Sequence, residues 1–205
     1  MSDERRGDAP AADGRFRVLV VCTGNLCRSP IAERLAQRTL LDRLGADFTA
    51  FSVSSAGTFA EDGTPMHPLA AATLAERGVS ADGFVTRSLT RDHVAAADLV
   101  LTAGREHRAQ CVELHPASLS KCFTVRQWTR LLDAVDPAVL AAGDPAARAR
   151  ALWIEVLAGR NTLQPGPPGS DDLPDPMGHP AKAFRACADE LSLAMHRTFG
   201  LIAGG

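Results

Sequence analysis

The sequence predicts an α/β fold with a four-stranded parallel sheet, doubly wound, with helices on both faces. Short apolar runs alternate along the chain with longer segments that have the periodicity of helices. The first run, Val18 to Val21, is apolar at every position and rich in valine, which is typical of a strand buried on both faces. No internal repeat or linker divides the chain, so a single domain is expected.

The elements are expected in the following order. After the first strand, Ser29 and Pro30 suit the N-cap and first position of a helix, which runs through Ile31, Leu35, Leu41 and Leu44 and stops at Gly45. Further strands are expected at 51–55, 99–101 and 122–125, and further helices at 67–77, 105–114, 146–159 and 181–199. Segment 164–178 is rich in Pro and Gly and is expected to be a loop.

The composition is that of a globular protein, with 205 residues, 45% hydrophobic and 22% charged. Residues 1–15 are polar and charged and are expected to form a disordered tail, with the domain over 16–205. The tail lacks the apolar core of a signal peptide, and no apolar stretch has the length of a membrane span.

Charge and cysteine content indicate which binding partners and which cellular compartment to expect for the protein. The net charge of -2 provides no basic field, so neither nucleic acid nor a membrane is expected as a partner. The five cysteines are odd in number and irregularly spaced, unlike a secreted disulfide framework: Cys22, Cys27, Cys111, Cys122 and Cys187. Thiols kept reduced in a cytosol fit better, and a cytoplasmic protein is expected.

The segment from Cys22 to Ser29 joins the first strand to the first helix. In open α/β sheets, ligands bind beyond the carboxyl ends of the strands. Free N–H groups at a helix N-terminus and in a curled loop bind phosphate oxygens. Gly24 is expected to relieve the tight curl, and Asn25 tolerates a left-handed backbone. We therefore expect phosphate to lie against Thr23, Gly24, Asn25, Leu26, Cys27 and Ser29.

Two side chains give this loop its expected chemistry. Arg28 adds a planar fork of donors for two phosphate oxygens. The same positive groups would stabilise a thiolate at Cys22, which would attack phosphorus and form a phosphocysteine. The Ser29 hydroxyl would bind the sulfur or fix the loop. A nucleotide-binding loop is disfavoured because the Gly-Lys-Ser/Thr ending is missing, and a zinc site on Cys22 and Cys27 lacks further ligands.

This segment resembles the signature of the low-molecular-weight protein tyrosine phosphatases: Cys, five residues, Arg and Ser directly after the first strand. Pro30, Ala32 and Glu33 match as well, and so do segments 55–58, 87–90 and 97–100. The resemblance covers 17 to about 125 and resumes at 175. Segment 126–164 is longer than the family norm and is interpreted as an insertion, whether a lid, a partner surface or a passive element.

The resemblance implies a general acid, which the family supplies as an Asp followed by Pro in a late loop. Asp175-Pro176-Met177-Gly178 fits this pattern, while Asp171 and Asp172 are weaker alternatives. The same side chain would later deprotonate the attacking water. Cys27 takes the place of the family's second loop cysteine, as a reversible disulfide partner of Cys22 or as a small packed residue.

The resemblance implies hydrolysis of protein phosphotyrosine, with no cofactor or metal expected. The chain has no tyrosine, so its pocket wall differs from the usual one, and Phe59 and Met177 are the candidate wall residues. Apolar Leu26 suits a phenyl ring and favours phosphotyrosine. The alternatives are a phosphoarginine phosphatase, a thiol-dependent arsenate reductase, for which Cys111 and Cys122 are poorly placed, and a non-catalytic phosphate-binding module. The oligomeric state stays open.

Overall fold

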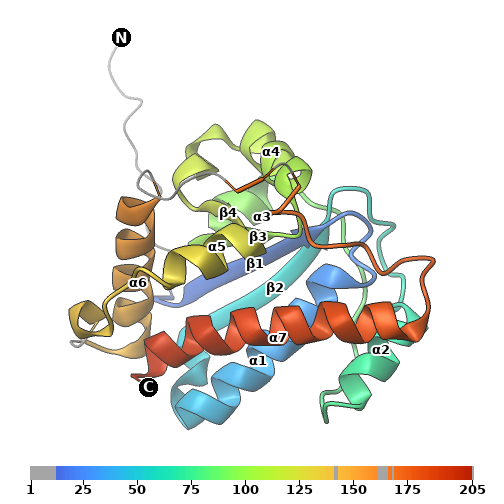
Figure 1. The fold of residues 1–205 in the computed structure, drawn as a ribbon, viewed down its shortest axis with the longest axis horizontal. Coiled ribbons are helices and arrows are strands. Elements are labelled where there is room, and N and C mark those ends of the chain that lie inside the picture. Colours follow the sequence, from blue (N-terminus) through green and yellow to red (C-terminus); the bar gives the residue numbers. More distant parts are fainter. Residues whose placement is uncertain (1–12, 141–142, 161–165, 168, 205) are drawn as a thin grey trace.

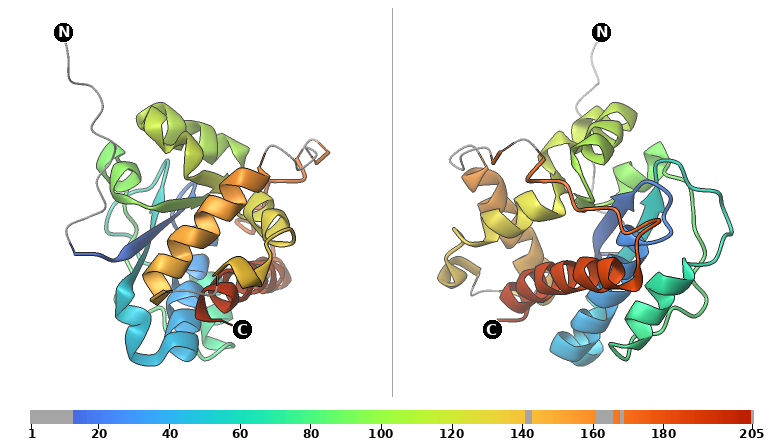
Figure 2. Two further views of the ribbon diagram at one scale, coloured as in Figure 1. Left: turned by 90° about the vertical axis from the view of Figure 1, so that its left-hand side faces the viewer. Right: turned by 45° about the vertical axis from the view of Figure 1, so that its right-hand side comes forward.

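The structure is a computed structural model that describes residues 13–140, 143–160, 166–167 and 169–204. Within them, a four-stranded parallel sheet has the strand order β2-β1-β3-β4. The strands are β1 (Phe16–Cys22), β2 (Phe51–Gly57), β3 (Leu99–Thr102) and β4 (Cys122–Thr124). Helices cover both faces of the sheet (Figures 1 and 2). The predicted fold class is confirmed.

The helices follow the predicted order, with two additions. They are α1 (Arg28–Leu44), α2 (Pro68–Ala75), α3 (Arg91–Ala96), α4 (Arg105–Leu114), α5 (Val125–Leu132), α6 (Pro145–Gly159) and α7 (Ala181–Ala203), with short 3-10 turns η1 (Gly45–Ala50), η2 (Pro116–Ser120) and η3 (Pro137–Leu140). Helices α3 and α5 were not predicted. Their N-caps Thr90 and Thr124 are the sequence signal for them, since each hydroxyl accepts a first-turn N–H.

Buried side chains pack on both faces of the sheet. Val18 and Val20 of β1 belong to the larger cluster, with α1 and α7. Leu19 and Val21 belong to a smaller cluster on the opposite face, with Val94 of α3. This follows from the alternation of side chains along a strand. The burial of all four residues confirms the prediction made from the apolar run.

Helices α5 and α6, which lie in the segment interpreted as an insertion, pack into the larger cluster. Trp128 of α5 is 1% exposed, and its indole N–H donates to the Thr198 hydroxyl of α7 at 3.0 Å. Leu152 of α6 is buried beside them. Positions 161–165 of this segment and 1–12 of the expected tail lie outside the described residues.

One detail of the first helix was predicted wrongly. The helix begins at Arg28 with Cys27 at the N-cap position, because the Ser29 hydroxyl is turned toward the Cys22 sulfur instead of capping. The helix runs through Ile31, Leu35, Leu41 and Leu44 as predicted, with Leu41 48% exposed and Leu40 buried. The expected stop at Gly45 is confirmed, with φ of 55°. None of the described helices has the length and apolar character needed to span a membrane.

Two leucines of α7 provide a matched test of this packing. Leu191 is 1% exposed and Leu193 is 57% exposed. Replacing Leu191 by Ala is expected to lower the free energy of unfolding by about 2–5 kcal/mol, because it leaves a cavity in the core. Leu193→Ala should change it by about 0.5 kcal/mol or less. Urea denaturation of both variants measures the difference, and equal effects would contradict this placement of α7.

Candidate active site

Residues 22–28 curl at the carboxyl end of β1, and the carbonyl groups of the first two residues face the segment that follows β2. The Cys22 carbonyl accepts the N–H of Thr58 at 2.9 Å, and the Thr23 carbonyl accepts the N–H of Phe59 at 2.9 Å. In a trans peptide, the C=O and the following N–H point in opposite directions. The N–H groups of Thr23 and Gly24 therefore point into the loop, where an anion would lie.

Asn25 holds the loop from inside. It has a φ of 54°, which is the left-handed region that the sequence predicted for it, and it is fully buried. Its amide Nδ2 donates to the hydroxyls of Ser29 and Ser55, each at 2.8 Å. Its Oδ1 accepts the N–H of Arg87 at 3.0 Å. The Ser55 hydroxyl in turn donates to Glu33 at 2.6 Å, and burial raises the pKa of Glu33.

The glycine that this geometry requires is Gly57, at the end of β2. A Cβ atom there would lie 2.5 Å from the Thr23 carbonyl oxygen and 2.8 Å from the Asn25 nitrogen. A Cβ at Gly24 would meet the Leu26 side chain at an ordinary 3.5 Å, and Gly24 has no positive φ. The predicted role of Gly24 in the curl is therefore wrong, because the close approach is between two segments and not within the loop.

Cys22 ends β1 at the base of the loop. The residue is 2% exposed, and its sulfur lies 3.0 Å from the Ser29 hydroxyl oxygen. That oxygen accepts from Asn25 and lies 3.4 Å from the Ala56 carbonyl, so the sulfur and this carbonyl compete for its proton.

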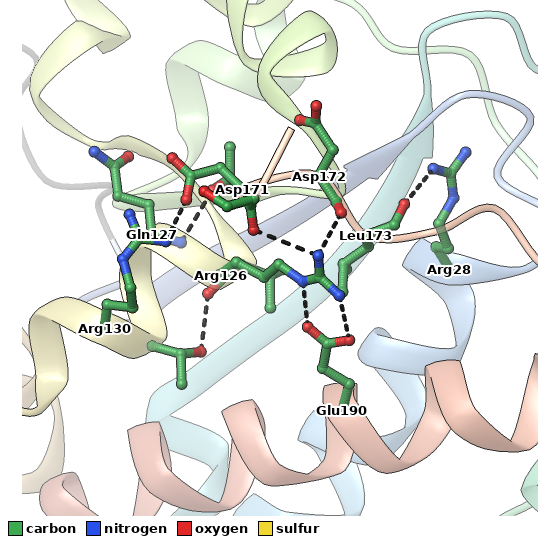
Figure 3. A network of polar contacts seen from close by, with 12 residues as sticks. Arg28, Arg126, Gln127, Arg130, Asp171, Asp172, Leu173 and Glu190 are labelled. Atoms are coloured by element: carbon green, nitrogen blue, oxygen red, sulfur yellow. Dashed lines mark hydrogen bonds and ion pairs between the residues drawn. The ribbon is translucent and has the colours of Figure 1, made fainter. Parts of the chain in front are cut away.

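Arg28 is 7% exposed and is held by three acceptors. Its Nη2 donates to Asp175 at 2.6 Å and to the Thr23 hydroxyl at 3.2 Å. Its Nη1 donates to the Leu173 carbonyl at 3.3 Å, as Figure 3 shows. The Nε atom is buried and has no partner among the described residues. A fixed guanidinium with a spare buried donor suits an incoming oxyanion.

The three aspartates before α7 have different partners, which separates the candidates for the acid. Asp171 pairs with Arg130 of α5. Asp172 accepts the Arg105 N–H at 2.7 Å, at the N-terminus of α4, where a carboxylate is favourable. Asp175 reaches Arg28 and is 47% exposed. The structure therefore brings Asp175 to the loop and leaves the other two in supporting contacts.

His107 was missed by the sequence analysis. It lies in α4, is 8% exposed, and places Nε2 2.9 Å from the Thr23 hydroxyl. Burial and, second, the charge of Arg28 lower its pKa. The ring is therefore neutral at physiological pH and shares a hydrogen bond with the Thr23 hydroxyl, which also accepts from Arg28. The available signal was a histidine in the first turn after β3, at the carboxyl edge of the sheet.

The remaining cysteines are buried. Cys27 lies in the larger core cluster with Cys22, and burial raises its pKa to about 12. Cys111 and Cys122 lie together in the smaller cluster, on the opposite face of the sheet. A hydrogen bond to Cys122 and burial raise the pKa of Cys111.

The candidate wall residues differ in exposure. Phe59 is 79% exposed and Met177 is 41% exposed, while Leu26 is half-buried and packs against the larger cluster. The backbone contact of Phe59 with Thr23 places it beside the loop. Whether these residues contact a substrate stays a prediction.

The comparison with known proteins agrees with this geometry. Residues 17–158 match the family described as low molecular weight phosphotyrosine protein phosphatase. The chain belongs to this family. It is 37% identical over 120 residues to the low molecular weight protein-tyrosine-phosphatase Etp of Escherichia coli K12, which covers 58% of this chain and 76% of Etp. It is 28% identical over 182 residues to a protein-arginine-phosphatase of Geobacillus stearothermophilus, covering 89% and 93%.

Solved structures of family members have the same fold. The YwlE arginine phosphatase from Geobacillus stearothermophilus superposes with a TM-score of 0.63 at 28% identity, covering 90% of this chain and 91% of that one. The low molecular weight protein tyrosine phosphatase from T. tengcongensis superposes with a TM-score of 0.63 at 27% identity, covering 89% and 96%.

The contact between Asp175 and Arg28 predicts competition with bound anions. Asp175→Asn is expected to lower the inhibition constant of inorganic phosphate about twofold to fivefold, since a partly exposed ion pair contributes about 0.2–1 kcal/mol. Isothermal titration measures the same affinity directly. Asp189→Asn, which removes a 70% exposed carboxylate paired with Arg77, is the control and should change nothing. Weaker phosphate binding by Asp175→Asn would contradict the prediction.

The lowered pKa of His107 predicts a pH dependence of stability. Around the ordinary histidine pKa of 6.5 the unfolded chain binds a proton that the folded ring does not. This group therefore contributes an unfolding free energy that rises with pH and is lost as pH falls below 6.5. His107→Gln should lose less stability on acidification, as measured by thermal unfolding across that range. An unchanged pH profile would contradict the assignment.

Proposed function

We propose that this chain is a cysteine-dependent phosphatase that hydrolyses protein phosphotyrosine through a phosphocysteine intermediate. The observation that carries the proposal is the meeting of Cys22, Arg28 and Asp175 at the carboxyl end of β1, around inward-pointing loop N–H groups. These groups are a nucleophile, an anion cradle and an acid, which together suffice for hydrolysis of a phosphate ester.

In the first step the Cys22 thiolate attacks phosphorus, forming the P–S bond while the P–O bond to the tyrosine breaks. The loop N–H groups and Arg28 hold the transferring phosphoryl oxygens. The phosphate takes the Arg28 donors that Asp175 occupies in this structure. Protonated Asp175 then gives its proton to the leaving phenolic oxygen.

In the second step water attacks the phosphocysteine. Asp175, now a carboxylate, takes a proton from that water. The P–S bond breaks, the thiolate returns to Cys22, and inorganic phosphate leaves. The Ser29 hydroxyl, 3.0 Å from the sulfur, stabilises the departing thiolate.

The substrate preference rests on the apolar residues near the loop. Leu26 presents no hydroxyl to a guanidinium, and the 79% exposed Phe59 beside the loop suits an aromatic substrate. The second candidate is phosphoarginine, which the relation to the arginine phosphatase favours, because that relative covers 89% of this chain whereas Etp covers 58%.

The positions of the other cysteines disfavour thiol-dependent arsenate reduction. A relay would have to pass electrons between Cys22 and two further cysteines. Cys111 and Cys122 pack on the opposite face of the sheet from Cys22, and both are fully buried. A non-catalytic binding module is disfavoured because Asp175, which phosphate binding alone does not need, lies against Arg28.

Several further assignments belong to the same proposal. The substrate is a phosphotyrosine protein, and the buried free thiols fit a cytoplasmic location. The residues from 16 to 205 form one domain. Cys27 is proposed as a packed residue in this conformation, because a raised pKa of about 12 opposes its thiolate; it pairs with Cys22 only after oxidation of the latter.

The activity and its substrate are tested together on the purified protein. We expect phosphate release from phosphotyrosine peptides to exceed that from phosphoarginine and phosphoserine peptides of the same sequence. Preferential release from phosphoarginine would establish the second candidate. No release from any of the three would overturn the proposed function.

Cys22→Ser is expected to abolish turnover while leaving phosphate affinity within about threefold, since the loop N–H groups and Arg28 remain. Phosphate release and phosphate titration on one preparation measure both quantities. Cys111→Ser, at a buried cysteine away from the loop, should retain turnover. An active Cys22→Ser variant would contradict the mechanism.

A further inference from the structure

Asp175 lies on an irregular segment that is fixed just before it. Residues 169–176 belong to no helix or strand. Leu173 is their anchor, since its N–H donates to the Ala103 carbonyl at 2.7 Å and its carbonyl accepts from Arg28 at 3.3 Å. Because only Pro174 separates Leu173 from Asp175, the reach of the Asp175 carboxyl depends on how this part of the main chain is held.

Arg126, in the first turn of α5, holds this main chain from the side (Figure 3). Its Nη1 donates to the Asp172 carbonyl at 2.8 Å and to the Ser170 carbonyl at 3.4 Å. Its Nη2 donates to the Glu190 carboxylate of α7 at 2.9 Å, and its Nε donates to the same carboxylate. One guanidinium therefore joins α5, α7 and the carbonyl groups of Ser170 and Asp172.

These contacts orient the segment and contribute little to the stability of the fold. The side chains of Arg126 and Glu190 are 29% and 36% exposed, so their ion pair alone contributes little to stability. A planar guanidinium that is bidentate to a carboxylate has a fixed orientation. Glu190 thus aims Nη1 at the two carbonyls. A lysine at 126 has no planar fork and cannot hold the carboxylate and both carbonyls at once.

Two other contacts of the segment are made by its side chains. Asp171 pairs with Arg130, and the Asp172 carboxylate accepts the Arg105 N–H. Neither contact involves a carbonyl group of the segment. Arg126 bonds the Ser170 and Asp172 carbonyls, and Arg28 bonds the Leu173 carbonyl.

We propose that Arg126 is a positioning residue for proton transfer by Asp175. It fixes the main chain of 170–172, which keeps Leu173 against Arg28 and keeps the Asp175 carboxyl within reach of the leaving oxygen. The inference rests on the phosphatase activity proposed above and names the contact that orients its acid.

The test is the leaving-group dependence of Arg126→Met, which keeps the length of the stem and removes the donors. Values of kcat/KM are measured for aryl phosphates whose phenols range from strongly to weakly acidic. We expect a loss of about tenfold or more for the poorest leaving group, which needs the acid, and a change within about threefold for 4-nitrophenyl phosphate. Arg126→Lys should follow Arg126→Met. An equal loss for all leaving groups, or recovery by lysine, would overturn the inference.

A second arm combines Arg126→Met with Asp175→Ala. With no acid left to orient, Arg126→Met is expected to add no further loss for the poor leaving group. A further loss of tenfold in the double variant would show that Arg126 acts through another group and would overturn the inference.

The matched control is Arg197→Met. Arg197 of α7 pairs with Asp133 at the end of α5, so it joins the same two helices without touching the segment before Asp175. Arg197→Met should keep the leaving-group dependence of the unmodified protein. If it instead loses activity mainly toward poor leaving groups, as Arg126→Met does, the effect comes from packing of the two helices and the inference is overturned.

If the unmodified protein hydrolyses no aryl phosphate, the proposed function and this inference both fail. An active protein whose Arg126→Met variant loses all substrates equally removes the inference alone.

Discussion

The buried amide of Asn25 is the contact on which the anion-binding loop depends. Its left-handed backbone turns the loop, and its side chain satisfies Ser29, Ser55 and the Arg87 N–H together. A buried amide left without these partners would cost the desolvation of each unpaired group. The loop therefore keeps one shape, with the Ser29 hydroxyl oxygen 3.0 Å from the Cys22 sulfur.

The site is assembled by two parts of the chain that enter from different directions. The loop comes from the end of β1, whereas Asp175 comes from the irregular segment before α7, held by Ala103, Arg28 and Arg126. Since Arg126 belongs to α5, the segment interpreted as an insertion contributes more than core volume. Its first turn bonds the main chain just before Asp175, the proposed acid.

Hydrogen bonds link the charged and polar side chains near the loop. Arg28 donates to Thr23 and to Asp175, and Thr23 contacts a neutral His107. Burial keeps the His107 pKa low, so the ring adds no positive charge beside Arg28. Asp175 accepts from Nη2 of Arg28, a donor that the proposed mechanism assigns to the phosphate.

The sequence by itself determined the fold class and the order of groups in the loop. Apolar runs such as Val18 to Val21 specify buried strands locally, and Cys22, Asn25 and Arg28 are close in the chain, so their relative placement follows from one strand–loop–helix turn. The Asp-Pro pair and the family resemblance also favoured Asp175 over Asp171 and Asp172. The tertiary structure alone decided what else lies around the loop: Gly57 as the required glycine, His107 against Thr23, the ion pair of Asp175 with Arg28, and Arg126 on the main chain before Asp175. These contacts join residues far apart in the chain, and no local propensity or spacing specifies them, because packing of the helices on the sheet brings them together.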